Sequence, residues 1–570
     1  MAVSARFLCF FIFYFRGVTF IFPYKTEQLD KFKYPTVLIS ILVRNKEHTL
    51  PYFLTYLSRL DYPKDRISLW IRSDHNQDDS AEVLEKWLKI NEKSYHSVDK
   101  LLISSNDHIE DEEGIAHWPP ARYSHIISLR EGALRTARHK WADYLWALDC
   151  DVFITNPGTL KKLIQKNQDI IAPMLRSDGL YSNFWCGMTS DYYYQRTDDY
   201  APILNRKNKG CHVVPMIHSS VLIDLQVVAS DFLTYDPKLL QNYFGPHDDI
   251  ITFAISANIS GINMTVCNDE IYGYVMVPLE KDDQLSYDFL QLRNLKLEVL
   301  VDGAPLEAED FLTSFIKDPH EGQIAVDKVF MINLVRRPDR RKRMVDSLKE
   351  LHLETTIVDA VDGQLLNDRT LESLGVKLMP GYKDPYHKRP MKLGEIGCFL
   401  SHYNIWKEVV DKEYDIVMVL EDDVRFEPFF NQKMHSLLDE MKRLSFKWDL
   451  VYLGRKRLDE GSEEPVEGTK FLLWAGYSYW TLGYLLSHSG ATKLLAQKPL
   501  QNILPVDEYL PILYDKHPED DWKAFYPIRD LVALSAEPLV LYPTRYLHEE
   551  GYISDTEDSR TVTVTPNPEL

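Results

Sequence analysis

The chain has 570 residues, 45% hydrophobic and 26% charged, which excludes a disordered polypeptide and favours two or more domains, each with its own core. Its formal net charge of −20 excludes a surface built to neutralise nucleic-acid phosphate, so we expect no nucleic-acid partner. The basic run at residues 336–343 is an exception, which the start of an amphipathic helix explains equally well.

The first residues combine a slightly basic start with a short apolar segment, residues 7–15, then Arg16 and a second apolar patch, residues 18–22. This pattern is typical of a secretory signal peptide, which we place at about residues 1–23. A membrane-spanning helix needs roughly twenty apolar residues, and Arg16 interrupts the run. No later segment is long enough, so we predict no stable membrane span.

The cysteines and two glycosylation motifs fit a secreted protein. Of the six cysteines, Cys9 would leave with the signal peptide and Cys398 lies far from the others in sequence. Each of the other four could be a buried free thiol or part of a disulfide, and they lack the paired C-x-x-C spacing of a zinc site. These four residues are Cys150, Cys186, Cys211 and Cys267. Asn258 and Asn263 begin Asn-x-Ser/Thr motifs and are candidate glycosylation sites.

The first half begins with an alternation of strands and helices. A β-rich apolar run at residues 37–45 predicts a buried strand that carries Arg44 near its end, and a Leu/Tyr-rich stretch at residues 50–60 predicts the next helix. A second strand, residues 67–72, ends in a polar turn that contains Asp74. This alternation predicts a parallel sheet wrapped by helices, with ligands at the carboxyl ends of the strands.

The second half repeats this plan. The strand at residues 329–337 resembles the first strand and contains the same Leu-Val-Arg tripeptide. In each half an acidic cluster follows an apolar strand, residues 144–148 or residues 416–420. The two clusters are Asp149-Cys150-Asp151 and Glu421-Asp422-Asp423. Two units in the same order predict two tandem domains of related α/β fold.

We place the domains at residues 34–290 and 326–558, with the boundary between residues 280 and 327 and a flexible tail at residues 559–570. The boundary region is rich in charged residues, which suits a connection between two cores.

The spacing of Asp149 and Asp151 predicts a metal site. Like charges this close repel in a partly dehydrated cleft, and a divalent cation removes that penalty. Oxygen ligands suit Mg²⁺ or Mn²⁺, which keep positions open for the phosphates of a nucleotide sugar. Asp74 and Arg44 are candidate nucleotide contacts; the alternatives are a helix cap for Asp74, a surface cation for Arg44 and a solvated loop for the acidic pair.

A second acidic pair, Asp248 and Asp249, precedes an apolar helix-like run at residues 251–255. If the sugar's anomeric configuration is inverted, a carboxylate must take the proton from the attacking hydroxyl, and either residue is a candidate for that base. The alternative is that one caps the helix and the other is exposed to solvent. His218 and His247 could complete a metal shell, or serve as hydrogen-bonded structural residues.

Several motifs in the second half resemble glycosyltransferase family 25. They are residues 394–403 (GEIGCFLSHY), 419–424 (VLEDDV), 331–341 (MINLVRRPDRR) and 359–363 (DAVDG). The two-domain layout is more similar to the animal procollagen galactosyltransferases of that family, and residues 146–151, 245–249 and 550–557 support that match. The resemblance spans about residues 34–558. It implies two tandem α/β domains of GT-A-like, Rossmann-like architecture that bind nucleotide sugars.

The resemblance also implies an activity and its setting. It implies transfer of galactose from UDP-galactose to hydroxylysine of collagen, with Mn²⁺, giving a β-linked product by inversion in the lumen of the endoplasmic reticulum. The implied partners are procollagen or other collagen-domain proteins, and a homodimer or a complex with collagen lysyl hydroxylase. The final Asn567-Pro568-Glu569-Leu570 is only a degenerate form of the usual retention signal.

The choice of catalytic domain stays open between the two halves. We expect transfer in the first, which holds the Asp-x-Asp pair and a candidate base. Glu421, Asp422 and Asp423 are candidate nucleotide contacts in the second, with Glu421 and Asp423 as metal ligands, and Asp507 and Glu508 are acid–base candidates there. Two alternatives remain: a lumenal or cell-adhesion protein that keeps the fold without turnover, and a transferase that acts on glycans or lipids.

Overall fold

The computed structural model describes residues 12–15, 18–21, 34–104, 107–319, 321–458, 461, 463–547, 549 and 551–562. Cys9, most of the expected signal peptide and the last residues of the tail, 563–570, lie outside the described residues. Within the expected signal peptide, only the strands β1 (Ile12–Phe15) and β2 (Val18–Ile21) are described. In the described part of the chain, no helix is both long and apolar enough to cross a membrane.

The chain divides into two compact units, each described here by itself. The first domain comprises Met1–Leu295 and Leu306–Pro319, and the second comprises Lys296–Pro305 and His320–Leu570. The change from one unit to the other therefore takes place between residues 295 and 320, inside the charged region at residues 280–327.

The first domain is built on an eight-stranded sheet. In spatial order its strands are β10 (Cys211–Val214), β13 (Met264–Cys267), β8 (Ile170–Pro173), β12 (Ser220–Asp224), β6 (Tyr144–Leu148), β3 (Val37–Val43), β4 (Ile67–Ser73) and β5 (Ser97–Leu102). Strands β5, β4, β3 and β6 are parallel, as predicted. The sheet as a whole is mixed, because β12 begins beside the end of β6, where the Asp149 amide donates to the Ser219 carbonyl (2.8 Å), and runs back.

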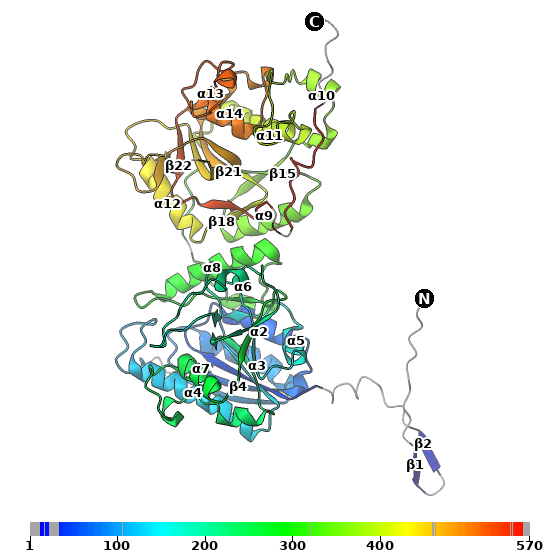
Figure 1. The fold of residues 1–570 in the computed structure, drawn as a ribbon, viewed down its shortest axis with the longest axis vertical. Helices are drawn as coiled ribbons and strands as arrows, with labels where there is room; N and C mark the ends of the chain where they lie inside the picture. The colour runs from blue at the N-terminus through cyan, green and yellow to red at the C-terminus, as the bar shows by residue number, and fades with distance from the viewer. Residues whose placement is uncertain are drawn as a thin grey trace. The chain divides into compact units, whose positions relative to one another are not determined.

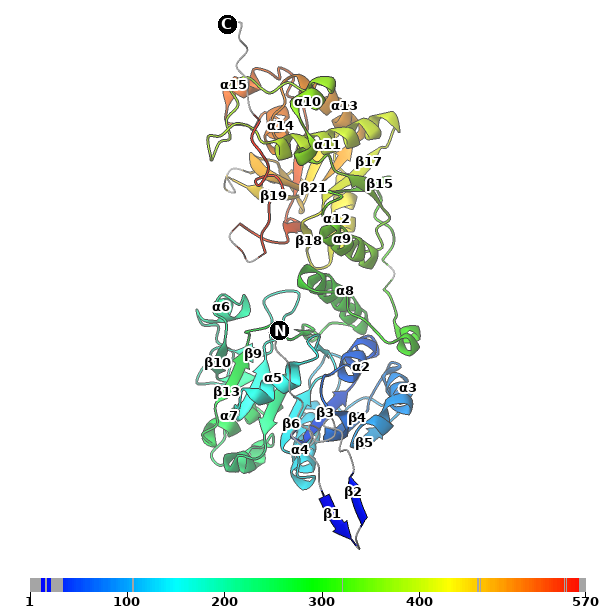
Figure 2. The same cartoon turned by 90° about the vertical axis from the view of Figure 1, so that its right-hand side faces the viewer.

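Helices cover both faces of this sheet (Figures 1 and 2). One face packs against α2 (Leu50–Ser58), α3 (Ser80–Asn91) and α5 (Thr159–Gln165), and the other against α4 (Pro120–His139), α6 (Tyr200–Leu204) and α7 (Asp249–Ile259). Side chains of β3 alternate between the two cores: Ile39 and Ile41 enter one and Leu38 the other. Helix α8 (Leu285–Asp302) follows and belongs in part to each unit.

The second domain has a seven-stranded sheet with helices on both faces. Its strands in spatial order are β16 (Thr355–Asp359), β15 (Lys328–Asn333), β17 (Ile416–Glu421), β21 (Ser478–Ser487), β19 (Leu450–Arg457), β22 (Ala533–Ala536) and β20 (Leu472–Trp474). One face packs against α9 (Pro338–Glu350) and α12 (Phe430–Met441), and the other against α11 (Leu393–Asp411), α13 (His488–Ala496) and α14 (Val506–Leu513). Two short helices, α10 (Asp368–Ser373) and α15 (Asp520–Lys523), complete it.

The two sheets have the same topology, strand for strand. The order β4-β3-β6-β12-β8-β13-β10 corresponds to β16-β15-β17-β21-β19-β22-β20, with the same directions and the same order along the chain. Each domain also pairs two short strands antiparallel: β7 (Val152–Phe153) with β14 (Tyr274–Val275), and β18 (Val424–Phe426) with β23 (Leu541–Pro543). Within the eight-stranded sheet, β5 is the one strand without a counterpart in the described part of the seven-stranded sheet. The predicted fold class, two tandem α/β domains, is confirmed.

Strand register fixes which residues correspond. Leu148 pairs with Ser220 and Leu420 with Gly483, so the two acidic clusters follow equivalent strand ends. On the neighbouring strand the pairing of Ser40 with Ala147 corresponds to that of Phe330 with Val419. The two Leu-Val-Arg tripeptides are therefore not equivalent: the counterpart of Arg44 is Leu334, and that of Lys46 is Arg336.

One disulfide joins the edge of the first sheet. Cys211 and Cys267 are bonded, and they occupy paired positions on the neighbouring strands β10 and β13. Cys150 and Cys186, the other two candidates, carry free thiols, as does Cys398. Two of the four candidate cysteines therefore form a disulfide, because they lie opposite each other on adjacent strands.

Candidate functional site

The first domain has a cavity of about 420 Å³ at the carboxyl ends of β3, β4 and β6. Its wall contains the nucleotide contacts, the carboxylate metal ligands and the bases predicted in this half: Arg44, Asp74, Asp149, Asp151, Asp248 and Asp249. These residues come from the ends of three strands and from the start of α7. The edge of the sheet where parallel strands end is where ligands bind in such folds.

Each acid of the Asp-x-Asp pair already contacts a cation. Arg130 of α4, whose side chain is 15% exposed, lies 3.0 Å from Asp149 and 2.5 Å from Asp249. Burial opposes the charge on Arg130, but these two carboxylates raise the pKa of its guanidinium overall. Lys46 lies 3.4 Å from Asp151 and 2.9 Å from Asp288 of α8. Two cations thus contact four carboxylates. Burial raises the pKa of Asp151, the carboxylates of Asp149 and Asp288 raise it further, and Lys46 offsets only part of this.

The two candidate bases differ in their surroundings. Asp248 is the N-cap of α7, and its Oδ1 accepts a hydrogen bond from the Ile251 amide (2.8 Å). Burial raises the pKa of Asp248 above its usual value. Asp249 is buried and held by Arg130, so it is not the solvent-exposed residue of the alternative. Helix capping by Asp248 is confirmed.

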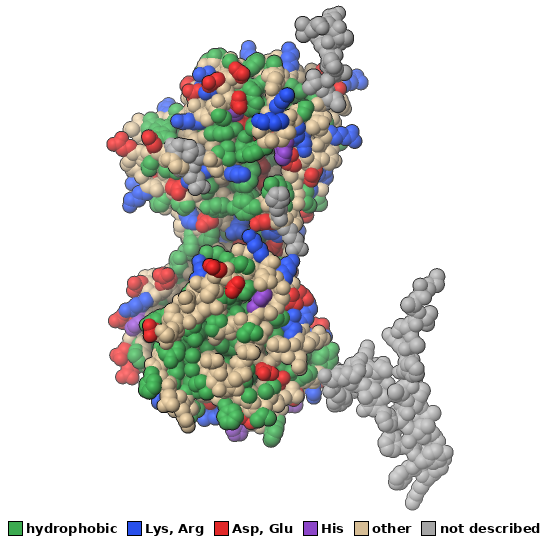
Figure 3. Space-filling model, in the orientation of Figure 1, with side chains coloured by type: hydrophobic (Ala, Val, Ile, Leu, Met, Phe, Trp, Pro, Cys, Tyr) green, Lys and Arg blue, Asp and Glu red, His purple; other side chains and the backbone are tan. Residues whose placement is uncertain are grey.

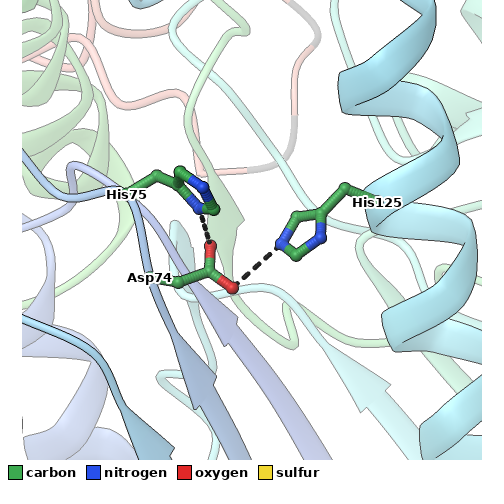
Figure 4. A group of neighbouring side chains, drawn as sticks. All are labelled: Asp74, His75 and His125. Atoms are coloured by element: carbon green, nitrogen blue, oxygen red, sulfur yellow. Dashed lines mark hydrogen bonds and ion pairs between the residues drawn. The ribbon is translucent and has the colours of Figure 1, made fainter. Parts of the chain in front are cut away.

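Asp74 lies between two imidazoles (Figure 4). Its carboxylate is 2.8 Å from Nδ1 of His75 and 2.9 Å from Nε2 of His125, and both rings point toward it. Burial would raise the pKa of Asp74, but these two hydrogen bonds lower it overall. The three ligand atoms lie within 4.8 Å of one another, as metal ligands do. Asp74 is no helix cap, because the N-cap of α3 is Asp79.

Arg44 is half-buried and is not a surface cation. Its guanidinium lies 2.5 Å from the Glu112 carboxylate, and its Nε donates to the carbonyl of His75 (3.3 Å). Its Nη1 is buried and has no hydrogen-bond partner in the described residues. A buried donor without a partner costs free energy, so Arg44 retains a donor for a ligand in the cavity.

The two candidate histidines lie in different surroundings. His218 lies in the cavity wall, where burial lowers the pKa of its imidazole to about 4 and keeps it neutral. His247 is exposed and contacts Ser124 (3.0 Å) instead. The contacts that sequence reasoning missed here are Lys46, Arg130 and Asp288, none of which belongs to a local motif.

The second domain has a smaller cavity, about 130 Å³, at the end of β17. Its wall contains Glu421, Asp422 and Asp423 together with Cys398 and His402 of α11. Burial and the neighbouring acids raise the pKa of Glu421 to about 8 and that of Asp423 to about 6. Arg340 lies 3.1 Å from Asp422 and 3.5 Å from Asp423, and Arg343, which donates to the Asp422 carbonyl, also lowers the pKa of Asp423.

The remaining neighbours of this acidic cluster do not neutralise it. His402 lies 3.4 Å from Glu421, but burial lowers the pKa of its imidazole to about 3, so the ring is neutral. Oδ1 of Asp423 is buried and has no hydrogen-bond partner among the described residues. Cys398 and His402 bring their ligand atoms within 4.8 Å of a Glu421 oxygen.

The acid–base candidates Asp507 and Glu508 lie in the first turn of α14, on the α11 side of the sheet. Glu508 is buried and engaged by His517 (2.9 Å) and by the Tyr477 hydroxyl (2.8 Å). Burial and Glu508 raise the pKa of Asp507 to about 8. Asp507 is also close enough to the Cys398 thiol to help raise the pKa of that thiol.

The two sites therefore differ in their fit to a divalent cation. An ion entering the first must displace or share Arg130 and Lys46, which already hold its carboxylates. Glu421 and Asp423 in the second have raised pKa values, as Asp151 has in the first, and the second also offers a buried Asp423 oxygen without a partner in the described residues, which fits a small oxygen-loving cation. Both clusters have the right ligand type, but the first acid of the second, Glu421, faces a neutral imidazole where Asp149 contacts a guanidinium.

The surface of the first domain also carries exposed hydrophobic side chains. Figure 3 shows them spread over much of the face of this domain that it draws. Trp118 is half exposed in the cavity wall, and Tyr193 and Phe244 are largely exposed. Such exposed area is typical of a surface that meets another molecule.

Comparisons with known proteins agree with this architecture. The family described as "Glycosyltransferase family 25, N-terminal domain" matches residues 34–296, and "Glycosyltransferase family 25 (LPS biosynthesis protein)" matches residues 326–510. A "Glycosyltransferase 25 family member" of Anopheles gambiae is 51% identical over 94% of this chain and 90% of its own. "Procollagen galactosyltransferase 2" of Homo sapiens is 48% identical over 92% of this chain and 84% of its own.

Among solved structures, S. aureus TarS 1-349 in complex with UDP-GlcNAc is 13% identical, with a TM-score of 0.28 over 49% of this chain and 70% of its own. A TM-score this low adds nothing to the argument, which rests on the family match and on the relatives. The chain belongs to glycosyltransferase family 25 and is a glycosyltransferase.

Proposed function

We propose that this protein transfers galactose from UDP-galactose to hydroxylysine residues of collagen, with inversion, and that the second domain catalyses the transfer. The relatives named procollagen galactosyltransferase support the substrates, because one is 48% identical over 92% of this chain. The observation that carries the choice of domain is the environment of Glu421, which lies 3.4 Å from the neutral imidazole of His402 and whose pKa is raised to about 8.

The electrostatics favour Mn²⁺ at this cluster. Partly buried carboxylates carry a desolvation cost that pairing or a bound metal offsets. In the first domain Arg130 and Lys46 provide that pairing, whereas in the second the partner of Glu421 is a neutral imidazole. We assign Glu421 and Asp423 as the metal ligands. Asp422 has a supporting role, because Arg340 and the Asn333 amide (2.7 Å) already bind it.

The residues of the second domain then have distinct tasks. A divalent ion held there would offset the charge that develops on the departing diphosphate. Arg340 orients Asp422 and Asp423. Asp507, with its pKa raised to about 8, accepts the proton of the attacking hydroxyl, since a base works best when its pKa lies near the working pH. Glu508 is already bonded to His517 and Tyr477, so it supports the start of α14.

The first domain keeps a binding role. Its cavity of about 420 Å³ is in the size range of small-molecule sites, and Arg44 and Asp74 lie in the wall as nucleotide contacts. Its acids are paired, however, and Asp249 is held by Arg130. We propose that it binds a nucleotide or supports the fold, without transferring sugar.

We also propose the lumen of the endoplasmic reticulum as the location. The Cys211–Cys267 disulfide supports an oxidising compartment. Asn258 and Asn263 are both exposed, as glycosylation requires.

The test is transfer of radiolabelled galactose from UDP-galactose to a hydroxylysine-containing collagen peptide, with and without Mn²⁺. We expect Asp423→Asn to lower transfer at least about a hundredfold, because a metal ligand is lost. The matched Asp151→Asn variant should keep transfer within about threefold per folded molecule. Loss in Asp151→Asn alone would move catalysis to the first domain. Turnover on glycans or lipids but not on collagen, or no turnover at all, would contradict the proposed function.

A further inference from the structure

Three arginines converge on one carboxylate beside the acidic cluster of the second domain. Arg336, Arg337 and Arg340, at the start of α9, form what we call the arginine cluster. Their guanidinium groups lie 2.5, 2.8 and 3.7 Å from the carboxylate oxygens of Asp555, which is 13% exposed. Two of these arginines, Arg336 and Arg340, line the same cavity as Glu421 and Asp423.

Asp555 belongs to a C-terminal segment, residues 551–562, that lies along the cavity. Arg340 donates a second bond to the Ile553 carbonyl (2.8 Å), and the Gly394 amide at the start of α11 donates to the Ser559 hydroxyl (2.9 Å). The Leu393 amide donates to the Arg560 carbonyl (2.8 Å). Residues 552–556 and Ser559 line the cavity, so this segment forms part of its wall and accounts for part of its small volume.

The first domain contains a reduced form of the same arrangement. By strand register Lys46 is the counterpart of Arg336, and Lys46 holds Asp288, which follows β14 as Asp555 follows β23. There one ammonium serves two carboxylates, those of Asp288 and Asp151. In the second domain three guanidinium groups face a single tail carboxylate.

The arginine cluster carries more hydrogen-bond donors than the Asp555 carboxylate can accept. Each guanidinium carries five N–H donors in a planar fork, and a carboxylate has only two oxygens. Part of the surplus is used: Arg336 also bonds Asp362 (2.9 Å), and Arg337 bonds Asp339 (3.1 Å). A diphosphate offers more oxygens and more charge, and arginine binds phosphate in two-point fashion. The start of a helix adds to the attraction for an anion.

We propose that the arginine cluster is the diphosphate site of the second domain, and that Asp555 occupies it as an internal substitute for the nucleotide. Binding of a nucleoside diphosphate then releases Asp555, and with it residues 551–562, from the cavity wall. The inference rests on the proposed function, since it assumes a nucleotide sugar in this cavity. It adds a competition between the donor and the chain's own tail.

Hydrogen exchange on the full chain tests the release directly. UDP with Mn²⁺ should increase deuterium uptake in residues 551–562 of the wild type, and inorganic pyrophosphate should do so more weakly. Replacing Arg336 and Arg337 together by Gln should raise at least tenfold the UDP concentration needed. Unchanged or decreased uptake in the tail at saturating UDP would overturn the inference.

A charge variant measures the competition itself. Asp555→Asn should lower, by about tenfold, the UDP concentration that half-protects residues 416–426, because the competing carboxylate is gone. Asp339→Asn is the matched control. Asp339 also pairs with Arg337, but its side chain is 66% exposed, so we expect its loss to change the half-protecting UDP concentration less than twofold. Equal or weaker UDP binding in Asp555→Asn would contradict the proposal.

These outcomes are separable from the transfer assay. If UDP increases deuterium uptake in residues 551–562 through the arginine cluster but no galactose is transferred, the diphosphate site is supported and the proposed function is contradicted. If galactose is transferred while Asp555→Asn leaves UDP binding unchanged, the proposed function holds and the tail competition fails.

Discussion

The two domains share one sheet topology but place different groups against the acids at the carboxyl ends of their strands. In the first, Arg130 contacts Asp149 and Lys46 contacts Asp151. In the second, Glu421 faces the neutral ring of His402, and its pKa rises to about 8. The comparison teaches that the strand-then-acid pattern locates a site without saying whether the site needs a metal.

Equivalent helices cause most of this difference. Helix α4 in the first domain and α11 in the second lie on the same face of their sheets, and each directs one side chain at the first acid of the cluster. On α4 that side chain is Arg130, and on α11 it is His402. Exchange of a guanidinium for a buried neutral imidazole removes one positive charge from beside the first acid, and a bound cation would restore it.

The largest effect should come from removing the internal cation of the first domain. Arg130→Met removes this partner from the buried Asp249 and from the partly exposed Asp149, so we expect this domain to lose about 3–5 kcal/mol of unfolding free energy. Mn²⁺ should restore part of the loss, because the acids then resemble those of the second domain. Urea titration with hydrogen exchange at residues 144–153 measures both effects.

Lys161→Met is the control for that experiment, since Lys161 pairs with the largely exposed Asp61. A surface pair of this kind contributes at most about 1 kcal/mol. A loss below about 1 kcal/mol in Arg130→Met would show that Arg130 does not balance the first site.

A second, smaller effect, the stabilisation by bound Mn²⁺, should show which domain binds the metal. At a concentration one hundred times its Kd, Mn²⁺ stabilises the domain that binds it by about 2.7 kcal/mol. We expect thermal unfolding to show this gain in the wild type and in Asp149→Asn, and to show none in Glu421→Gln. Chelation with EDTA should reverse it. A gain that persists in Glu421→Gln and disappears in Asp149→Asn would exchange the roles of the two domains.

The sequence predicted the positions of these sites well. Strand β6 has the predicted bounds, residues 144–148, and β17 extends one residue beyond its predicted end to include Glu421. Both are runs of buried apolar residues with an acidic turn after them, so the local signal suffices. The same local signal misled at the Leu-Val-Arg tripeptides, because three shared letters do not fix strand register.

Charge balance could not be predicted, because it is a tertiary property. Asp288 reaches Lys46 from 242 residues away, and Arg130 lies within a helix that has no motif around it.

The disulfide is also a tertiary property. The spacing of four cysteines allowed several pairings, and only the adjacency of β10 and β13 selects Cys211 with Cys267. The expectation that the first domain is catalytic arose from its motifs alone and stays untested.

The smallest predicted effect concerns pH and tests which domain holds the base. A base must be unprotonated to accept the hydroxyl proton, and the pKa of Asp507 is raised to about 8. With saturating Mn²⁺, kcat/KM should therefore rise about tenfold per pH unit below pH 8 and level off above it. Asp507→Asn should lower kcat/KM and abolish this slope. Asp248→Asn, which removes the corresponding candidate of the first domain, should leave the profile unchanged, and a flat profile in that variant would place the base at α7 instead of α14.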